Sequence, residues 1–109
     1  MIIKEKISKE KFAEIAEDVV LLKLAVDIER KILSAGCELH SDCAEELAED
    51  GSLAKDIWGA GIYVNTKKVD LNSLINIRPG EGNRSMNIRI PEVKARVEAV
   101  IKELLPYGE

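Results

Sequence analysis

The chain has 109 residues and contains no glutamine, a single histidine, two cysteines and few aromatic residues, which make up 4% of the sequence. Its longest apolar run covers residues 19–22, far short of the roughly 20 residues that span a membrane. The first six residues also lack the charged and then apolar order of a signal peptide. We therefore expect a cytoplasmic protein with no membrane partner. The lack of glutamine beside abundant lysine and glutamate hints at a thermophilic source.

Charge is distributed unevenly along the chain. Residues 1–54 hold seven basic and thirteen acidic side chains, and residues 55–109 hold nine and seven, for a net charge of −4. The basic residues of the second half have acids between them and almost no aromatic neighbours on which bases could stack. This pattern is typical of a solvated mixed surface, and we expect no nucleic-acid partner.

The two cysteines, Cys37 and Cys43, are six positions apart. If the segment between them is extended, their Cα atoms lie about 20 Å apart, which is too far for a disulfide. We therefore expect free thiols. A Cys37–Cys43 bond would contradict an extended segment.

The two ends of the chain carry the clearest signals of regular structure. Residues 1–7 fit a short edge strand, and Ser8 is a suitable N-cap for a helix whose apolar residues follow helical spacing. Pro91 suits the first turn of a second helix, which Pro106 ends, and the apolar residues between them fall on one face.

Two segments between these helices, residues 57–64 and 71–77, are rich in β-branched residues and partly alternate apolar with polar positions, which predicts strands. Gly59 and Gly61 in the first segment indicate a bulge or a close backbone approach. Trp58 would share one side of that strand with other apolar residues, where a tryptophan usually fills the core.

Residues 21–50 fit two different structures. One is helical: the apolar residues at 21, 24, 25, 28 and 32 fit a helix that ends at Gly36, and residues 44–50 are good helix formers ahead of Gly51. The other is a β-hairpin that turns at residues 35–36 and sets Ile32 opposite Leu39. Periodicity alone does not decide between them. We favour the hairpin, because its register collects apolar side chains on one face.

In that hairpin, Glu38, His40 and Asp42 would project in a row from the other face, with Glu29 facing Asp42. Opposed carboxylates repel, so water, a cation or a divalent metal ion must offset their charge. Carboxylates and an imidazole are ligand types of iron, manganese and zinc sites. The three residues are therefore candidate ligands of a divalent metal cofactor. A plain solvated strand face shows the same alternation and is more common.

Residues 76–86 leave an apolar segment and enter a glycine-rich loop with Arg78 and Arg84 on either side. The loop lacks the Gly-Lys-Ser/Thr end of a P-loop and opens no helix, as a dinucleotide motif requires. Two guanidinium groups could hold a carboxylate or phosphate if the loop brings them together. The candidate ligand-binding residues are Asn76, Arg78, Asn83 and Arg84. A mobile hairpin tip is the common alternative.

Six short motifs occur in order along the chain. They are residues 23–30 (KLAVDIER), 38–43 (ELHSDC), 49–52 (EDGS), 56–60 (DIWGA), 73–79 (SLINIRP) and 83–86 (NRSM). This set resembles a family of small bacterial and archaeal proteins filed as a domain of unknown function. The resemblance covers most of the chain, favours the extended form of the middle segment and implies no activity. The chain departs from the family pattern at residues 35–37, where the family has a run of glycines, and at Ala44, where it has an acid.

We expect one α+β domain over residues 1–109, in which an antiparallel meander of about four to five strands is covered on one face by an N-terminal and a C-terminal helix. The expected core consists of Phe12, Ile15, Val26, Ile28, Trp58, Ile75, Ile77, Val97 and Ile101. The uncovered face leaves three functions open. We favour a small binding domain that recognises an anionic small molecule or a protein partner. The alternatives are a metal-assisted hydrolase or lyase and a homo-oligomeric interaction protein.

Overall fold

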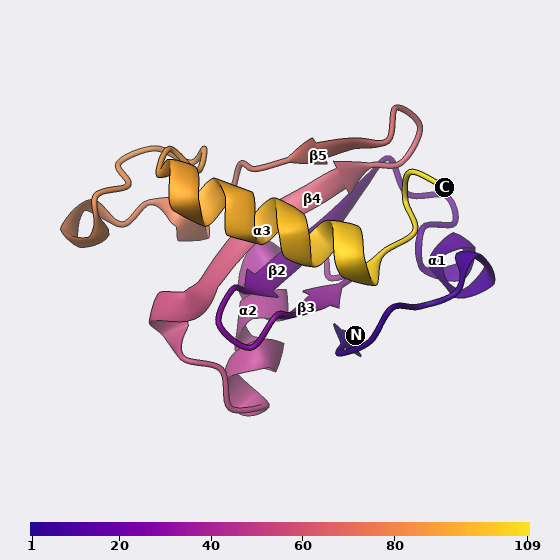
Figure 1. Ribbon diagram of the computed structural model, residues 1–109, viewed down its shortest axis with the longest axis horizontal. Helices are drawn as coiled ribbons and strands as arrows, with labels where there is room; N and C mark the ends of the chain where they lie inside the picture. Colours follow the sequence, from indigo (N-terminus) through magenta and orange to yellow (C-terminus); the bar gives the residue numbers. More distant parts are fainter.

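The computed structural model describes residues 1–109 as a five-stranded sheet with helices on both faces (Figure 1). The strands are β1 (Ile2–Ile3), β2 (Leu21–Asp27), β3 (Ile32–Ala35), β4 (Ile57–Tyr63) and β5 (Lys68–Asp70). The helices are α1 (Lys9–Ile15), α2 (His40–Glu49) and α3 (Pro91–Leu104), with 3-10 turns η1 (Ala54–Asp56), η2 (Leu74–Asn76) and η3 (Pro79–Glu81). The strand order is β1-β3-β2-β4-β5, and every neighbouring pair is antiparallel. The predicted α+β class is therefore confirmed.

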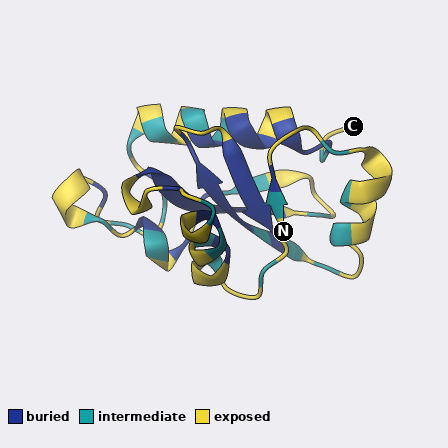
Figure 2. Cartoon of the chain, turned by 90° about the horizontal axis from the view of Figure 1, so that it is seen from below, coloured by how far each residue is buried: buried dark blue, intermediate teal, exposed yellow.

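The ends of the chain form the predicted elements. β1 is an edge strand beside β3, and the Ser8 hydroxyl caps α1 by accepting a hydrogen bond from the Lys11 N–H at 3.0 Å. α3 begins at Pro91 and lies across one face of the sheet (Figure 1). Its inner side is buried, as the side view in Figure 2 shows. The residues that it buries are Val97, Val100, Ile101 and Leu104.

The main core lies between the sheet and α3. It contains Trp58, Ala60 and Ile62 of β4, which share one side of that strand as predicted, together with alternate residues of β2. Trp58 is 2% exposed. Ile77 was expected in the core but is 43% exposed, because it lies beyond the end of the sheet.

The opposite face of the sheet is covered by α2, where a strand and an open polar face were expected. Cys43 and Leu47 of α2 are fully buried in a second cluster that includes Ala25, Ile32 and Ile57. The helical alternative is therefore correct for residues 44–50 and wrong for residues 21–32, which hold strands, and the strand assigned after residue 35 is wrong. The physical reason is that this apolar face of the sheet needs a cover, which an amphipathic helix supplies.

β2 and β3 do form a hairpin, but it turns at residues 28–31 rather than at residues 35–36, where the favoured register placed the turn. Asp27 Oδ1 accepts hydrogen bonds from the backbone N–H groups of Glu29 and Arg30, both at 2.9 Å. Lys31 closes the turn with a φ of 58°. An aspartate side chain thus supplies the turn chemistry, so no glycine is needed.

The expected strand at residues 71–77 is also wrong. β5 ends at Asp70, and residues 71–90 form a long loop that contains η2 and η3. Isolated bridges close this loop near its base, between Asn72 and Asn87, and near its tip. We refer to residues 71–90 as the long loop.

The prediction of free thiols is wrong as well. Cys37 and Cys43 form a disulfide, with their Cα atoms 5.7 Å apart. The extended segment assumed for that prediction does not exist, because α2 begins at His40 and coils the chain back toward Cys37.

No helix of the protein combines the length and the apolar character needed to cross a bilayer.

Candidate functional site

Asn76 lies fully buried beside β4 and takes the place of a neighbouring strand. Its Oδ1 accepts a hydrogen bond from the Gly59 N–H at 2.8 Å, and its Nδ2 donates to the Gly59 carbonyl at 2.9 Å. The same Nδ2 lies 3.2 Å from the Leu71 carbonyl and 3.1 Å from the Met86 carbonyl. A Cβ on Gly59 would lie 2.5 Å from the Cβ of Ser73, so at this glycine the Ser73 side chain lies directly against the backbone of β4.

Asn83 is also fully buried and holds the tip of the long loop. Its Nδ2 lies within 2.7–3.1 Å of three backbone carbonyls, and its Oδ1 accepts a hydrogen bond from the Arg89 N–H at 2.7 Å. The polar atoms of Asn76 and Asn83 are therefore engaged by the backbone of the protein itself. The two asparagines therefore hold the backbone of the long loop in its conformation through hydrogen bonds from buried side chains.

The guanidinium of Arg78 is engaged by the protein too. It donates to three backbone carbonyls, of which those of Ile75 and Lys55 lie at 3.1 Å, and it stacks 4.1 Å above the ring of Trp58. Burial lowers the pKa of Arg78, against the opposing effect of the Glu81 carboxylate 3.7 Å away. These contacts dock the start of η3 onto β4.

Arg84 differs from Arg78 in every one of these respects. It is exposed and makes no hydrogen bond or ion pair with the rest of the chain. The structure therefore gives the two arginines no common partner. Of the four candidate ligand-binding residues, only Arg84 offers its side-chain polar atoms to solvent.

The three candidate metal ligands do not form a row, because α2 replaces the expected strand. Glu38 precedes the helix and is exposed, His40 begins it, and Asp42 lies in its first turn. His40 Nε2 lies 2.9 Å from the Ala60 carbonyl, so this nitrogen carries the proton and donates it. Burial lowers the pKa of His40. No group of three or more His, Cys, Asp or Glu side chains is placed to hold a metal ion.

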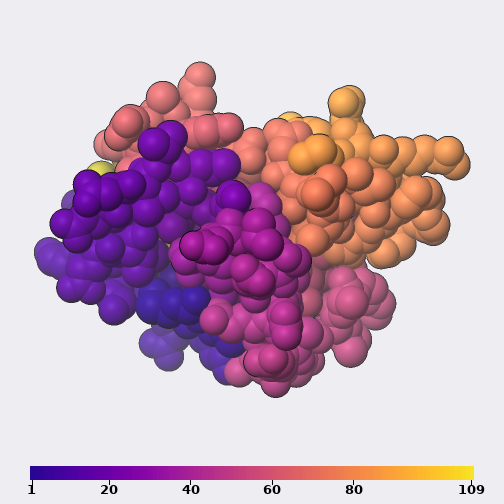
Figure 3. Space-filling model, turned by 180° about the vertical axis from the view of Figure 1, so that it is seen from behind, coloured from indigo at the N-terminus to yellow at the C-terminus, as the bar shows by residue number.

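A groove of about 530 Å³ runs along α2, between that helix and the segments around η1 and η2. Figure 3 shows this face of the molecule, with α2 beside the long loop and the η1 segment. The apolar residues that line the groove are Ala44, Ala48, Ala54, Ile57 and Ile75. The polar residues that line it are Ser41, Glu45, Lys55, Arg78 and Glu81. We call this the α2 groove. Sequence analysis missed it, because it exists only if residues 40–49 are helical.

A second hollow, of about 420 Å³, lies beside the first turn of α2. Leu39, His40, Leu74 and Met86 line it, and Ser41 and Ile75 line both hollows. Three of these side chains are exposed hydrophobics: Leu39 at 57%, Leu74 at 72% and Met86 at 43%. Apolar surface on this face thus extends beyond the α2 groove itself.

One carboxylate that lines the α2 groove, Glu45, makes no ion pair, and neither do Asp42 and Glu49, which follow the same side of α2 outside the lining. The two cations of the groove are engaged. Lys55 pairs with the neighbouring carboxylate at 3.1 Å, and Arg78 is held by carbonyls. The first half of the chain also carries most of the acidic excess.

These features define a small α+β domain in which an antiparallel sheet is packed between helices and a long loop is fastened by two buried asparagines. The chain belongs to the family described as protein of unknown function (DUF5674), whose model matches residues 1–104. The family membership indicated by the six short motifs is thereby confirmed. No curated protein and no solved structure matches the chain.

Proposed function

We propose that this protein is a small binding domain that takes up a positively charged protein segment with apolar side chains in the α2 groove. The observation that carries the proposal is an apolar floor beside Glu45, a lining carboxylate that has no cation partner, on the side of α2 that also carries the unpaired Asp42 and Glu49. Helix-lined grooves of this kind accept amphipathic helices, whose apolar face enters the groove.

The floor of the groove supplies the apolar part of the interaction. Ala44 and Ala48 are one helical turn apart on α2, and their small side chains leave room for larger side chains of a partner. Leu39, Leu53 and Leu74 are exposed by 57%, 58% and 72% around the same face. Burying one such leucine fully contributes about 1.5–3 kcal/mol.

The rim of the groove selects the charge of the partner. Asp42, Glu45 and Glu49 are three and four positions apart, so they follow one side of α2. Because none of them is paired within the protein, lysine or arginine side chains of a partner can neutralise them. Complementary charge of this kind speeds association and suppresses wrong partners.

The same geometry favours a protein partner over the anionic small molecule. Arg78, which is the one of the two arginines that lines the groove, donates its side-chain hydrogen bonds to backbone carbonyls. Unpaired carboxylates beside the groove would repel an anion. The metal-assisted reaction and the homo-oligomer remain alternatives, and light scattering during the experiment below would reveal self-association.

The test is an NMR titration with a 14-residue amphipathic peptide of leucine and lysine as the probe. We expect amide shifts confined to Ser41, Ala44, Glu45, Ala48 and Ile75 and their neighbours. A peptide of the same pattern with glutamate in place of lysine should cause no shifts. Shifts spread over both faces of the sheet would contradict the proposal.

Two matched variants make the test specific. Glu45→Lys should weaken binding of the lysine peptide about fivefold, as expected for one charge at the rim of an interface. Glu103→Lys makes the same change of charge on α3, across the sheet, and should leave binding unchanged. Equal binding by wild type and Glu45→Lys would refute the assignment of the groove.

A further inference from the structure

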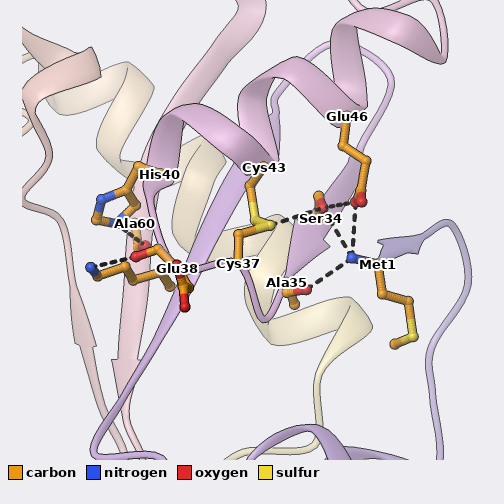
Figure 4. Close-up of a disulfide and its surroundings, with 10 residues drawn as sticks. Met1, Ser34, Ala35, Cys37, Glu38, His40, Cys43, Glu46 and Ala60 are labelled. Carbon is orange, nitrogen blue, oxygen red and sulfur yellow. Dashed lines mark hydrogen bonds and ion pairs between the residues drawn. A yellow bond between two sulfur atoms is a disulfide. The ribbon is translucent and has the colours of Figure 1, made fainter.

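The two sulfur atoms of the disulfide lie in different surroundings (Figure 4). Cys43 is fully buried and packs in the cluster under α2 with Leu47 and Ile57. Cys37 is partly exposed, and the residues on either side of it, Gly36 and Glu38, are exposed. Of the two cysteines, only Cys37 is therefore open to a reagent in solution.

We infer that the Cys37–Cys43 disulfide is a thiol–disulfide exchange site at which an external thiolate attacks Cys37. In the first step the thiolate forms a bond to Cys37 Sγ, the Cys37–Cys43 bond breaks, and Cys43 leaves as a thiolate that takes a proton from water. When the reagent is a dithiol, its second thiolate then attacks the reagent sulfur that is bonded to Cys37. The mixed disulfide breaks, and Cys37 leaves as a thiolate. Two electrons pass to the protein, and the dithiol becomes a disulfide.

The position of Cys43 favours its role as the leaving group. Cys43 is the fourth residue of α2, and helix side chains lean toward the helix N-terminus. Its sulfur therefore lies beside the first turn, where the partial positive charge of the helix offsets part of the cost of forming a thiolate in the apolar cluster. Because it is anchored in the core, Cys43 also stays in place to reform the bond.

The position of Cys37 favours its role as the attacked atom. Residues 36–38 are held to the sheet by a backbone hydrogen bond from the Gly36 N–H to Lys23 at 3.1 Å and by one from Lys23 Nζ to the Glu38 carbonyl at 2.7 Å. The Leu39 carbonyl accepts hydrogen bonds only from the first turn of α2, from the Asp42 and Cys43 N–H groups. Gly36 has a φ of 83°, and a Cβ there would meet no atom within 4 Å. The segment can thus move away with the attacking group once the bond opens.

Charged groups surround the bond on several sides. Glu38 and Asp42 are the sequence neighbours of the two cysteines, Glu46 and the N-terminal ammonium of Met1 both contact Ser34, and Lys23 donates to the Glu38 carbonyl. The Glu46 carboxylate lies 2.9 Å from that ammonium, so its charge is offset. Ser34 Oγ lies 4.0 Å from Cys37 Sγ, within reach of a weak hydrogen bond to sulfur.

Opening the bond would release the segment that leads into α2. That segment includes Leu39, which lines the second hollow together with His40. The inference does not depend on the proposed function, because it concerns the sulfurs and their accessibility alone.

The first experiment follows reduction of the native protein by reduced dithiothreitol, with alkylation and mass spectrometry at timed intervals. We expect the bond to open without urea, and at a rate that stays constant as urea rises through concentrations that leave the protein folded. A rate that rises with the unfolded fraction would show that the bond reacts only in unfolded molecules, and would overturn the inference.

The second experiment assigns the reactive sulfur with Cys43→Ala and Cys37→Ala, each of which keeps one thiol. With oxidised glutathione, the variant that keeps Cys37 should form a mixed disulfide about tenfold faster than the variant that keeps Cys43. Equal rates, or faster reaction of Cys43, would overturn the inference. Circular dichroism checks that each variant is folded, and if one is not, the urea series on the wild type decides alone.

Discussion

The burial of Asn76 leads to a sharp prediction about stability. Replacing it with alanine removes the partner of the Gly59 N–H and of the Gly59 carbonyl, both in a buried part of the structure. Each buried group left without a partner costs about 1–3 kcal/mol, so the two together cost about 2–6 kcal/mol. Because a domain of this size is stable by about 5–15 kcal/mol, Asn76→Ala should lose a large part of its stability.

Asn76→Asp separates hydrogen bonding from the loss of volume. The aspartate keeps an acceptor for the Gly59 N–H but replaces the donor that faces the carbonyls of Gly59, Leu71 and Met86. A carboxylate facing these oxygens should destabilise at least as much as alanine at pH 7. The loss should shrink in acid, because a protonated carboxyl group can donate one hydrogen bond.

The measurement is urea unfolding followed by the fluorescence of Trp58, the only tryptophan, which is 2% exposed. Asn65→Asp is the control, because Asn65 is exposed in the turn between β4 and β5, and this change should alter stability by less than about 0.5 kcal/mol. A loss below about 1 kcal/mol for Asn76→Ala would refute the assignment of Asn76 as a substitute for a strand.

Three further predictions concern single residues. Gly59→Ala should destabilise by about 1–3 kcal/mol in urea unfolding, because the new Cβ would lie 2.5 Å from the Ser73 Cβ. Glu46→Gln should lower the free energy of unfolding by less than about 1 kcal/mol at pH 7, because the pair between Glu46 and the ammonium of Met1 is exposed. That ammonium lowers the pKa of Glu46, so the difference between the two proteins should vanish well below pH 4.5. The NMR titration of His40, the only histidine, should give a pKa below 6.5. The free energy of unfolding should therefore decrease as the pH falls below 6.5, because the unfolded chain then binds the proton more readily than the folded protein does.

Contrary outcomes are equally specific for these three. Unchanged stability of Gly59→Ala would mean that the loop can retreat from β4. A stability loss for Glu46→Gln that persists unchanged in strong acid would mean that the carboxylate charge is not its source. A His40 midpoint at or above 6.5 would contradict the assignment of burial as the main influence on the pKa of this half-buried ring.

The elements that could be predicted from the sequence are those whose signals are local. The Ser8 cap, the Pro91 start and the apolar face of α3 all depend on neighbours within a few residues, and each corresponds to an observed element. The strand at residues 57–64 was equally clear, and the glycine at position 59 correctly indicated a close contact.

The middle of the chain could not be predicted because its turns are made by side chains. Asp27 closes the β2–β3 turn where the favoured register placed it at residues 35–36, and that shift misassigned the residues that follow up to the end of α2. Residues 40–49 could then be read as a strand or a helix. Only the uncovered apolar face of the sheet, a tertiary feature, decides for the helix.

The polar residues that sequence analysis selected in the long loop as ligand-binding candidates serve the backbone of the protein instead, with the exception of Arg84. Asn76, Arg78 and Asn83 stand where a polar side chain must satisfy buried backbone groups, because the chain has no strand there to do so. A sequence shows that such residues interrupt an apolar pattern. It does not show whether their partners are a ligand or the backbone.

The disulfide illustrates how stability and reactivity can coexist in this fold. A cross-link between residues six positions apart closes a short loop, and the loop-entropy relation gives it about 2 kcal/mol. That is a small part of the stability expected for a domain whose sheet is packed on both faces. The protein should therefore stay folded when the bond opens, with Cys43 still in its core position. Exchange in the native state requires both conditions, and a bond that held the fold together would meet neither.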